Sequence, residues 1–309
     1  MPGMSHARAV TLMVLVTLLW SSAGVVSRHL EAARGFEVTF WRSAFNALAL
    51  LVALPLLRGA GLWRSLREGG RALWLSGLCW AVMFTAFMFA LTLTSVANVL
   101  VTMAIGPLIT ALFARVFLHH QLPARTWGAI AVAGAGIAWM FGAELQTGAA
   151  AGMGVALAVP LAAAVNFTVL QHVSHGSGDP DEALGGEAAA TPDMLPAVLI
   201  GGLLSALVTL PLAWPLQASS HDLMLLAGLG VFQLALPCLL VVGLTAVLPA
   251  PEIALLGLLE VLFGVLWAWV GAGEVPGPAT LSGGLLVLGA LVGNELLALA
   301  GRHRTGPAR

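Results

Sequence analysis

The chain has 309 residues, of which 59% are hydrophobic and 9% are charged, and its formal net charge is −1. Soluble domains typically carry about 25% charged residues, so this chain cannot present a water-compatible surface and its solvent must be lipid. The near-zero net charge gives no basis for nucleic-acid binding. The two cysteines, Cys79 and Cys238, lie inside apolar runs and indicate neither a disulfide framework nor a metal motif.

Long apolar runs with almost no charge predict ten membrane-spanning helices. Lipid-exposed backbone must be hydrogen-bonded within a helix or around a closed barrel, and a barrel needs short alternating segments rather than continuous runs. The first run follows Arg8 as in a signal peptide, but it continues through Val26 and further spans follow, which favours an uncleaved first span. We expect spans at about 9–27, 37–57, 71–92, 96–118, 126–143, 150–172, 194–215, 222–246, 252–272 and 279–299.

The arginines predict the orientation of these spans, because cytoplasmic loops carry an excess of basic residues. With the N-terminus in the cytoplasm, only Arg28 and Arg34 fall in the outer loops. The loop at 174–193 is expected inside although it is acidic, since acidic residues count little in this rule. We therefore expect a multi-pass protein of a bacterial inner (plasma) membrane with both termini in the cytoplasm. The arginines on the cytoplasmic side would be Arg8, Arg58, Arg64, Arg67, Arg71, Arg125, Arg302, Arg304 and Arg309.

The predicted spans divide into two sets of five. An odd number of spans per set gives the halves opposite orientations, as in many secondary transporters. Weak sequence echoes support this arrangement: Gly106 and Glu260 are 154 positions apart, and so are His120 and Glu274. The expected fold class is an all-α polytopic membrane protein with ten transmembrane helices as two inverted five-helix repeats. The expected regions are a first repeat at 1–145, a second at 146–300 with an acidic cytoplasmic linker at 174–193, and a cytoplasmic tail at 301–309.

Several short patches follow one another along the chain. They are Leu18-Leu19-Trp20-Ser21-Ser22, Phe40-Trp41-Arg42, Gly106-Pro107-Leu108 with Phe117-Leu118-His119-His120, Leu258-Leu259-Glu260-Val261 with Glu274, and the stretch from Gly283 to Gly293. As an ordered set they resemble the EamA-type ten-helix permeases of the drug/metabolite transporter superfamily. The sequence departs from the family pattern at His120, where the family has Glu, and at Val261, where it has Pro. The resemblance implies gradient-driven export of small metabolites, often amino acids or their relatives, through a cavity lined mainly by spans three, four, eight and nine.

Ionisable groups inside spans are candidates for function, because each costs about 2.5–3.5 kcal/mol on insertion scales. Glu260 lies about eight residues into the ninth predicted span, where a carboxyl that exchanges protons would couple transport to a proton gradient; the alternative is a neutral carboxyl bonded to a neighbouring helix. Arg42 is a candidate anchor for a carboxylate, or else it reaches outward to the headgroups. Adjacent side chains on a helix point about 100° apart, so His119 and His120 are poor joint metal ligands, and we expect no metal or cofactor.

Aromatic and uncharged polar residues complete the predicted substrate cavity. Trp80, Phe84 and Phe87 share one helix face and, with Met88, could line an apolar pocket, although helix packing or lipid contact would explain the same pattern. Polar side chains in a span tend to face the bundle interior, as cavity liners or as helix–helix hydrogen bonds. The expected cavity residues are Trp20, Arg42, Trp80, Phe84, Phe87, Met88, Asn98, Thr102, Asn166, Gln233 and Glu260, of which Glu260 is the proton-coupling candidate.

The sequence thus predicts a secondary active transporter that works by alternating access, and no catalytic residues. The competing classes are an integral-membrane enzyme acting on lipids and a channel or scaffold. Such enzymes usually display paired acids for metal-bound diphosphates, which the predicted spans lack, and the sequence has no clear re-entrant filter. The expected partners are a small-molecule substrate and the lipid bilayer. Gly289 and Gly293 form a GxxxG pattern that indicates close helix packing or a homodimer face.

Overall fold

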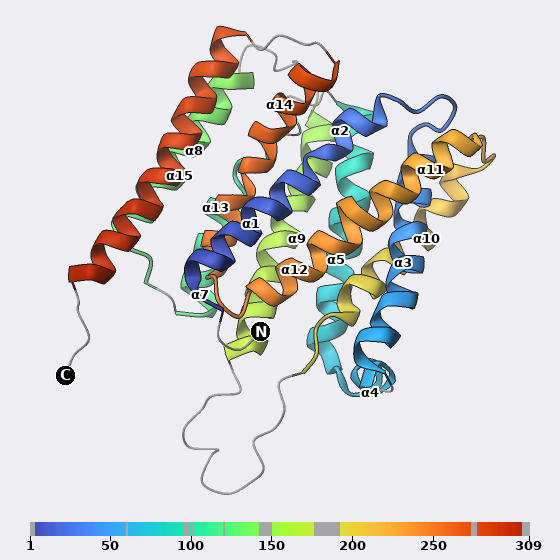
Figure 1. Cartoon of the computed structure of the whole chain (residues 1–309), viewed down its shortest axis with the longest axis horizontal. Helices are drawn as coiled ribbons and strands as arrows, with labels where there is room; N and C mark the ends of the chain where they lie inside the picture. Colours follow the sequence, from blue (N-terminus) through green and yellow to red (C-terminus); the bar gives the residue numbers. More distant parts are fainter. Residues whose placement is uncertain are drawn as a thin grey trace, which may run out of the picture.

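The computed structural model describes residues 4–59, 61–94, 99, 102–119, 121–141, 150–175, 192–272 and 277–304. Within these ranges every regular element is a helix, and the helices form one bundle (Figure 1). Seven helical stretches in the described chain are long and apolar enough to cross a membrane, and the shorter helices Gly106–Phe117 and Pro278–Asn294 are apolar too. The prediction of an all-α, multi-pass membrane protein is confirmed.

The helices follow the predicted apolar runs closely. The run at 96–118 is the exception, because Thr102 and Met103 are helical, turns follow at Ala104 and Ile105, and helix α7 then begins at Gly106; residues 95–98, 100 and 101 lie outside the described residues. Earlier elements are α1 (His6–Trp20), α2 (Ser22–Ser27), α3 (Phe36–Arg58), α4 (Gly61–Glu68), α5 (Gly70–Leu93), α7 (Gly106–Phe117) and α8 (Ala124–Phe141). Later ones are α9 (Ala150–His175), α10 (Pro196–Ala213), α11 (Ser220–Gly228), the π-helix η4 (Leu229–Ala235), α12 (Leu236–Leu244), α13 (Ala250–Gly257), α14 (Leu259–Ala272) and α15 (Pro278–Arg304).

Several runs are interrupted partway across. Turns at Ala104 and Ile105 precede α7, whose first turn contains Pro107; proline lacks a backbone N–H and therefore suits the start of a helix. A second turn at Leu258 separates α13 from α14. There the backbone N–H of Val261 donates to the Leu258 carbonyl at 3.1 Å, a tightened turn that needs no proline. The departure from the family pattern at Val261 therefore does not remove the break in this helix.

The helices α3, α5, α10 and η4 pack closely because small residues lie between them. A Cβ added to Gly202 would lie 2.6 Å from Asn46 Nδ2, and one added to Gly230 would lie 2.6 Å from Phe45 Cβ. The hydroxyl of Ser205 is 2.9 Å from those of both Ser43 and Thr85, which joins α10 to α3 and α5. These contacts are the kind that stabilise helix association inside a membrane, where small residues let backbones approach.

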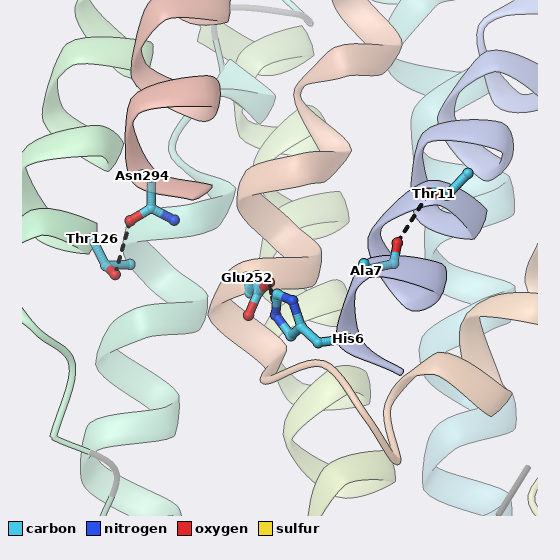
Figure 2. Close-up of polar contacts among 6 residues, drawn as sticks. All are labelled: His6, Ala7, Thr11, Thr126, Glu252 and Asn294. Carbon is cyan, nitrogen blue, oxygen red and sulfur yellow. Dashed lines mark hydrogen bonds and ion pairs between the residues drawn. The ribbon is translucent and has the colours of Figure 1, made fainter. Parts of the chain in front are cut away.

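The pair α8 and α15 forms one edge of the bundle (Figure 1). The buried Thr126 hydroxyl donates to Asn294 Oδ1 at 3.2 Å (Figure 2), and Gly136 leaves room for the Gly283 carbonyl oxygen. Gly289 and Gly293, in contrast, have no neighbour within 4 Å of an added Cβ. The predicted GxxxG pattern therefore does not mediate packing between described helices of this chain.

Two buried carboxylates join loops to helices at the end of the bundle that carries α2 and α11 (Figure 1). Asp222 in α11 accepts hydrogen bonds from the backbone N–H groups of Glu31, Ala32 and Ala33 at 2.7–2.9 Å. Glu37 in α3 accepts two from the N–H groups of 217–218, at 2.7 and 2.8 Å. We call Asp222 and Glu37 the carboxylate clamps. Each clamp holds the loop that leads toward the other clamp's helix.

The opposite end of the bundle holds the start of α1, the helix α4 and the end of α15 (Figure 1). His6 at the start of α1 lies 2.6 Å from the Glu252 carboxylate at the start of α13 (Figure 2). Arg58 Nε at the end of α3 lies 2.9 Å from Asp193 Oδ2, in the segment that leads into α10. The first and last described helices therefore begin and end on the same side of the bundle.

Candidate functional site

A cavity of about 180 Å³ lies inside the bundle, bordered by α1, α3, α5, α7, α9, η4, α12, α13 and α14. Most of its wall is formed by large apolar side chains, among them Trp20, Trp80, Phe84, Phe87 and Phe167. Its volume is below the roughly 300–1,000 Å³ of drug-sized pockets. The cavity therefore has the size and lining for a small molecule with an apolar part.

Both interrupted runs meet at this cavity. Ala104, in the turn before α7, and Leu258, in the turn before α14, line it and are 154 positions apart, the spacing of the sequence echoes. Glu260 lies in the first turn of α14, where the helix dipole stabilises a negative charge. Discontinuous helices of this kind leave backbone groups and helix termini available inside a membrane protein, and transporters use them to bind substrates and ions.

Arg42 projects from α3 into the cavity lining and is almost fully buried. Its Nη2 donates to the main-chain carbonyl of Phe84 at 3.3 Å, which fixes the guanidinium against α5. Among the described residues, its Nε has no hydrogen-bond partner. An arginine held by one main-chain bond keeps most of its planar donor edge free for a ligand.

Glu260 faces the same cavity from α14. Among the described residues, no hydrogen bond or ion pair within 4.0 Å reaches its carboxyl. Arg42 and the Cys238 thiol line the same cavity. The cavity thus contains one basic and one acidic side chain that face it without forming a direct pair among the described residues.

Uncharged polar groups without partners also border the cavity. Gln233, on the π-helix η4, donates from Nε2 to the Trp20 carbonyl at 3.2 Å, while its Oε1 has no partner among the described residues. The Trp80 indole N–H and the Thr110 hydroxyl, likewise, have none in the described chain. Buried polar atoms are nearly always satisfied, and π-helices are frequent at functional sites. Together these atoms mark a place where a polar ligand could bind.

The structure brings seven of the predicted cavity residues together and places the others elsewhere. Met88 packs in a separate cluster with Leu226 and Leu229, since it follows Phe87 and so points about 100° away. Asn166 accepts a hydrogen bond from Ser76 at 2.6 Å and does not line the cavity. Thr102 is buried outside the lining, and Asn98 lies outside the described residues. Those that line it are Trp20, Arg42, Trp80, Phe84, Phe87, Gln233 and Glu260.

Sequence reasoning missed several lining residues, chiefly Met13, Met83, Met103, Thr110 and Phe167. Apolar side chains such as Met13 look the same in sequence whether they face lipid, another helix or a cavity. Two prolines, Pro107 and Pro160, also line the cavity. Proline within an apolar run disturbs helix hydrogen bonding. These two prolines are therefore the sequence signal that could have indicated this part of the cavity.

Fold and site together define a multi-pass helical membrane protein with an internal ligand-sized cavity between interrupted helices. Residues 7–142 match the sequence profile of the EamA-like transporter family. The resemblance seen in the sequence is therefore confirmed over this part of the chain. The family consists of membrane transporters, which favours transport of small molecules over enzymatic activity.

A protein of known crystal structure shares the fold across nearly the whole chain. It covers 95% of this chain and 99% of its own length, with a TM-score of 0.70 and 19% sequence identity. At that identity the similarity concerns the fold alone. No curated protein sequence matches this chain.

Proposed function

We propose that the chain is a secondary active transporter that exports small metabolites, such as amino acids or amphiphilic compounds, across the inner membrane by alternating access. The observation that supports this function best is the cavity between the turns at Ala104 and Leu258, with unpartnered charged and polar groups facing it. Ligand-dependent thermal stabilisation of the purified protein tests it, screened with amino acids, nucleosides and hydrophobic drugs. A ligand at 100 times its dissociation constant should add about 2.7 kcal/mol to the free energy of unfolding. Stabilising compounds should then cross proteoliposome membranes faster than membranes without the protein.

Ten spans in two inverted five-span repeats, at 1–145 and 146–300, are part of this proposal. Helix packing supports it, because the contacts are symmetric between the two proposed repeats. Each span either packs against its equivalent five places later, or makes a contact that the equivalent spans make too. The pairs α3 with α10, α7 with α13 and α8 with α15 join equivalent spans. The packing of α5 on α9 corresponds to that of α12 on α1. The linker proposed at 174–193 falls largely outside the described residues.

The proposed orientation, with both termini in the cytoplasm, predicts which loops an impermeant thiol reagent can reach. His29 and Gln121 are both exposed, and they lie in loops assigned to opposite sides. Cys79 and Cys238 are buried, so background labelling should be low. With the reagent applied to intact cells, we expect His29→Cys to react and Gln121→Cys to react only after the membrane is permeabilised. The reverse labelling pattern would show that the chain has the opposite orientation in the membrane.

Glu260 is the proposed proton-coupling group, because its carboxyl lines the cavity and no hydrogen bond or ion pair from another described residue holds it in one protonation state. We expect Glu260→Gln to abolish the pH dependence of transport, since glutamine keeps the shape but cannot release a proton. The measurement is flux of an identified substrate into proteoliposomes across a pH series. Thr110→Val alters the same cavity without removing an ionisable group and should retain the pH response. An unchanged pH response in Glu260→Gln would exclude this role.

A further inference from the structure

We infer that α4 and the start of α5 form a binding site for an anionic phospholipid, whose phosphate lies against Arg64, Arg67 and Arg71 and whose acyl chains lie along the exposed face of α5. We call these three arginines the basic patch. The site lies at the end of the bundle that holds α4 (Figure 1), which is the cytoplasmic end in the proposed orientation. It does not include the cavity, so the inference goes beyond the proposed transport function and does not depend on it.

Basic residues are concentrated in the connection between α3 and α5. Four of the thirteen in the chain lie within residues 58–71, where Glu68 is the one acidic residue. Arg58 is already engaged, because its Nε lies 2.9 Å from Asp193 Oδ2. The basic patch is exposed, and no ion pair with a described carboxylate engages its guanidinium groups. Its three positive charges can therefore meet an anion from outside the chain.

The position of α4 is fixed by the backbone at its two ends and by one buried face. Gly59 and Gly70 have φ angles of 54° and 57°, a left-handed conformation that glycine adopts without steric cost, and they turn the chain sharply at either end of the helix. Leu62 is 1% exposed and Leu66 is partly buried, and both pack against the main core. Since they are four residues apart, they share one face of α4. The two arginines of α4 are therefore presented by a helix that is held against the bundle.

The exposed face of α5 continues from the basic patch into the membrane. Four of its exposed residues recur at i, i+3, i+4 and i+7 and so share one face: Arg71, Trp74, Leu75 and Leu78. The span that contains them begins at Gly70, which places the charge of Arg71 at the membrane boundary and the apolar side chains deeper in the bilayer. On α4, Trp63 is 61% exposed, and tryptophan favours the same boundary. A cation at the boundary followed by apolar surface complements a phospholipid, in which a phosphate at the boundary is followed by acyl chains.

The charge of the site distinguishes an anionic phospholipid from the alternatives. Guanidinium groups present a planar set of donors that matches phosphate oxygens. Phosphatidylcholine adds a cationic group that the basic patch would repel, whereas phosphatidylglycerol adds only uncharged hydroxyls. Each basic residue beside a span strengthens the attraction to anionic lipid by about fivefold in binding constant. Inorganic phosphate would satisfy the arginines but would leave the apolar face of α5 unused.

The test is a lipid titration of the purified chain in detergent. Phosphatidylglycerol and phosphatidylcholine with identical acyl chains are added separately, bound lipids are counted by native mass spectrometry, and the melting temperature is followed in parallel. We expect phosphatidylglycerol to bind at least about tenfold more tightly than phosphatidylcholine and to raise the melting temperature further. Inorganic phosphate at the same concentrations should leave the melting temperature unchanged.

Single substitutions locate the effect on the surface of the protein. Arg64→Gln, Arg67→Gln and Arg71→Gln should each lower the ratio of the phosphatidylglycerol to the phosphatidylcholine binding constant about fivefold. Arg125→Gln is the matched control, because Arg125 is also an exposed arginine assigned to the cytoplasmic side but lies in α8, at the edge of the bundle away from α4 (Figure 1). Its ratio should stay that of the unmodified protein. Because each ratio is measured within one variant, a change in stability that affects both lipids alike cancels.

Several results would overturn the inference. Equal binding of the two lipids, or a ratio that Arg125→Gln lowers as much as the patch variants do, would show that the arginines act only as part of the overall charge. Equal stabilisation by inorganic phosphate would indicate a site for free anions instead of a lipid.

The acidic segment at 174–193 is the competing occupant within the chain. If the preference for phosphatidylglycerol appears only after Asp179, Asp181, Glu182 and Glu187 are replaced by their amides, that segment occupies the basic patch and the inference is wrong. The transport proposal is unaffected by any of these results, because the cavity is not part of the lipid site.

Discussion

Replacing Gly257 by phenylalanine is expected to abolish transport without unfolding the protein. Gly257 is the last residue of α13 and lines the cavity, and a Cβ added there meets nothing within 4 Å. The ring would therefore occupy part of the cavity in which the substrate is proposed to bind. Filling an apolar cavity favours the folded state, so the melting temperature should stay the same or rise. Substrate affinity should fall by at least about two orders of magnitude, or about 2.8 kcal/mol.

Gly264→Phe is the matched control for this variant. Gly264 lies in α14, two turns farther along the same run, and also has no neighbour within 4 Å of an added Cβ, but it does not line the cavity. It should transport like the unmodified protein. Ligand-dependent stabilisation and proteoliposome flux measure both variants. Normal flux in Gly257→Phe would show that substrates use a different path.

Replacing Gly230 by alanine is expected to lower the free energy of unfolding by about 3 kcal/mol, the upper part of the range for overpacking. An added Cβ would lie 2.6 Å from Phe45 Cβ and 2.8 Å from both the Arg42 carbonyl oxygen and the Asn46 backbone nitrogen. Two of these three obstacles are backbone atoms, which cannot move aside as a side chain can. The contact between η4 and α3 must then open. Thermal unfolding in detergent measures the loss.

At the nearby Gly228 we expect an alanine substitution not to lower the free energy of unfolding. It ends α11, two residues before Gly230, and an added Cβ there meets nothing within 4 Å. Alanine in a helix is favoured over glycine by about 0.5–1 kcal/mol, so Gly228→Ala should leave stability unchanged or raise it slightly. Equal destabilisation of the two variants would show that this contact between η4 and α3 is not tight.

Hydrophobicity alone predicted the class and most helix bounds, because lipid imposes long apolar helices irrespective of tertiary detail. Helix periodicity correctly placed Trp80, Phe84 and Phe87 on one face, and all three line the cavity. It could not place the break before α7, which the turns at Ala104 and Ile105 form. Nor did it identify Gly230 as a packing contact, because the chain has 36 glycines and nothing in the sequence distinguishes this one.

The site was harder to predict than the fold, since a polar side chain in a span has more than one way to be satisfied. Asn166 and Gln233 look alike in sequence, yet Asn166 bonds to Ser76 while Gln233 faces the cavity. Charge was the more useful guide. Arg42 and Glu260 were singled out because burying an ionisable group is costly, and the structure places both in one cavity. That they face it without pairing depends on the packing of several helices and has no signature in the sequence.

The carboxylate clamps imply that the two proposed repeats do not move as two separate rigid bodies. Asp222, from the second proposed repeat, holds a loop of the first, and Glu37 holds a loop of the second in return. With α3, α5 and α10 also joined through Ser205, the two repeats are fastened to each other along one side. In the proposed alternating-access mechanism, that side would stay fixed as a frame. The helices that could move relative to this frame are those outside the fastened group. Among them, α7, α13 and α14 line the cavity.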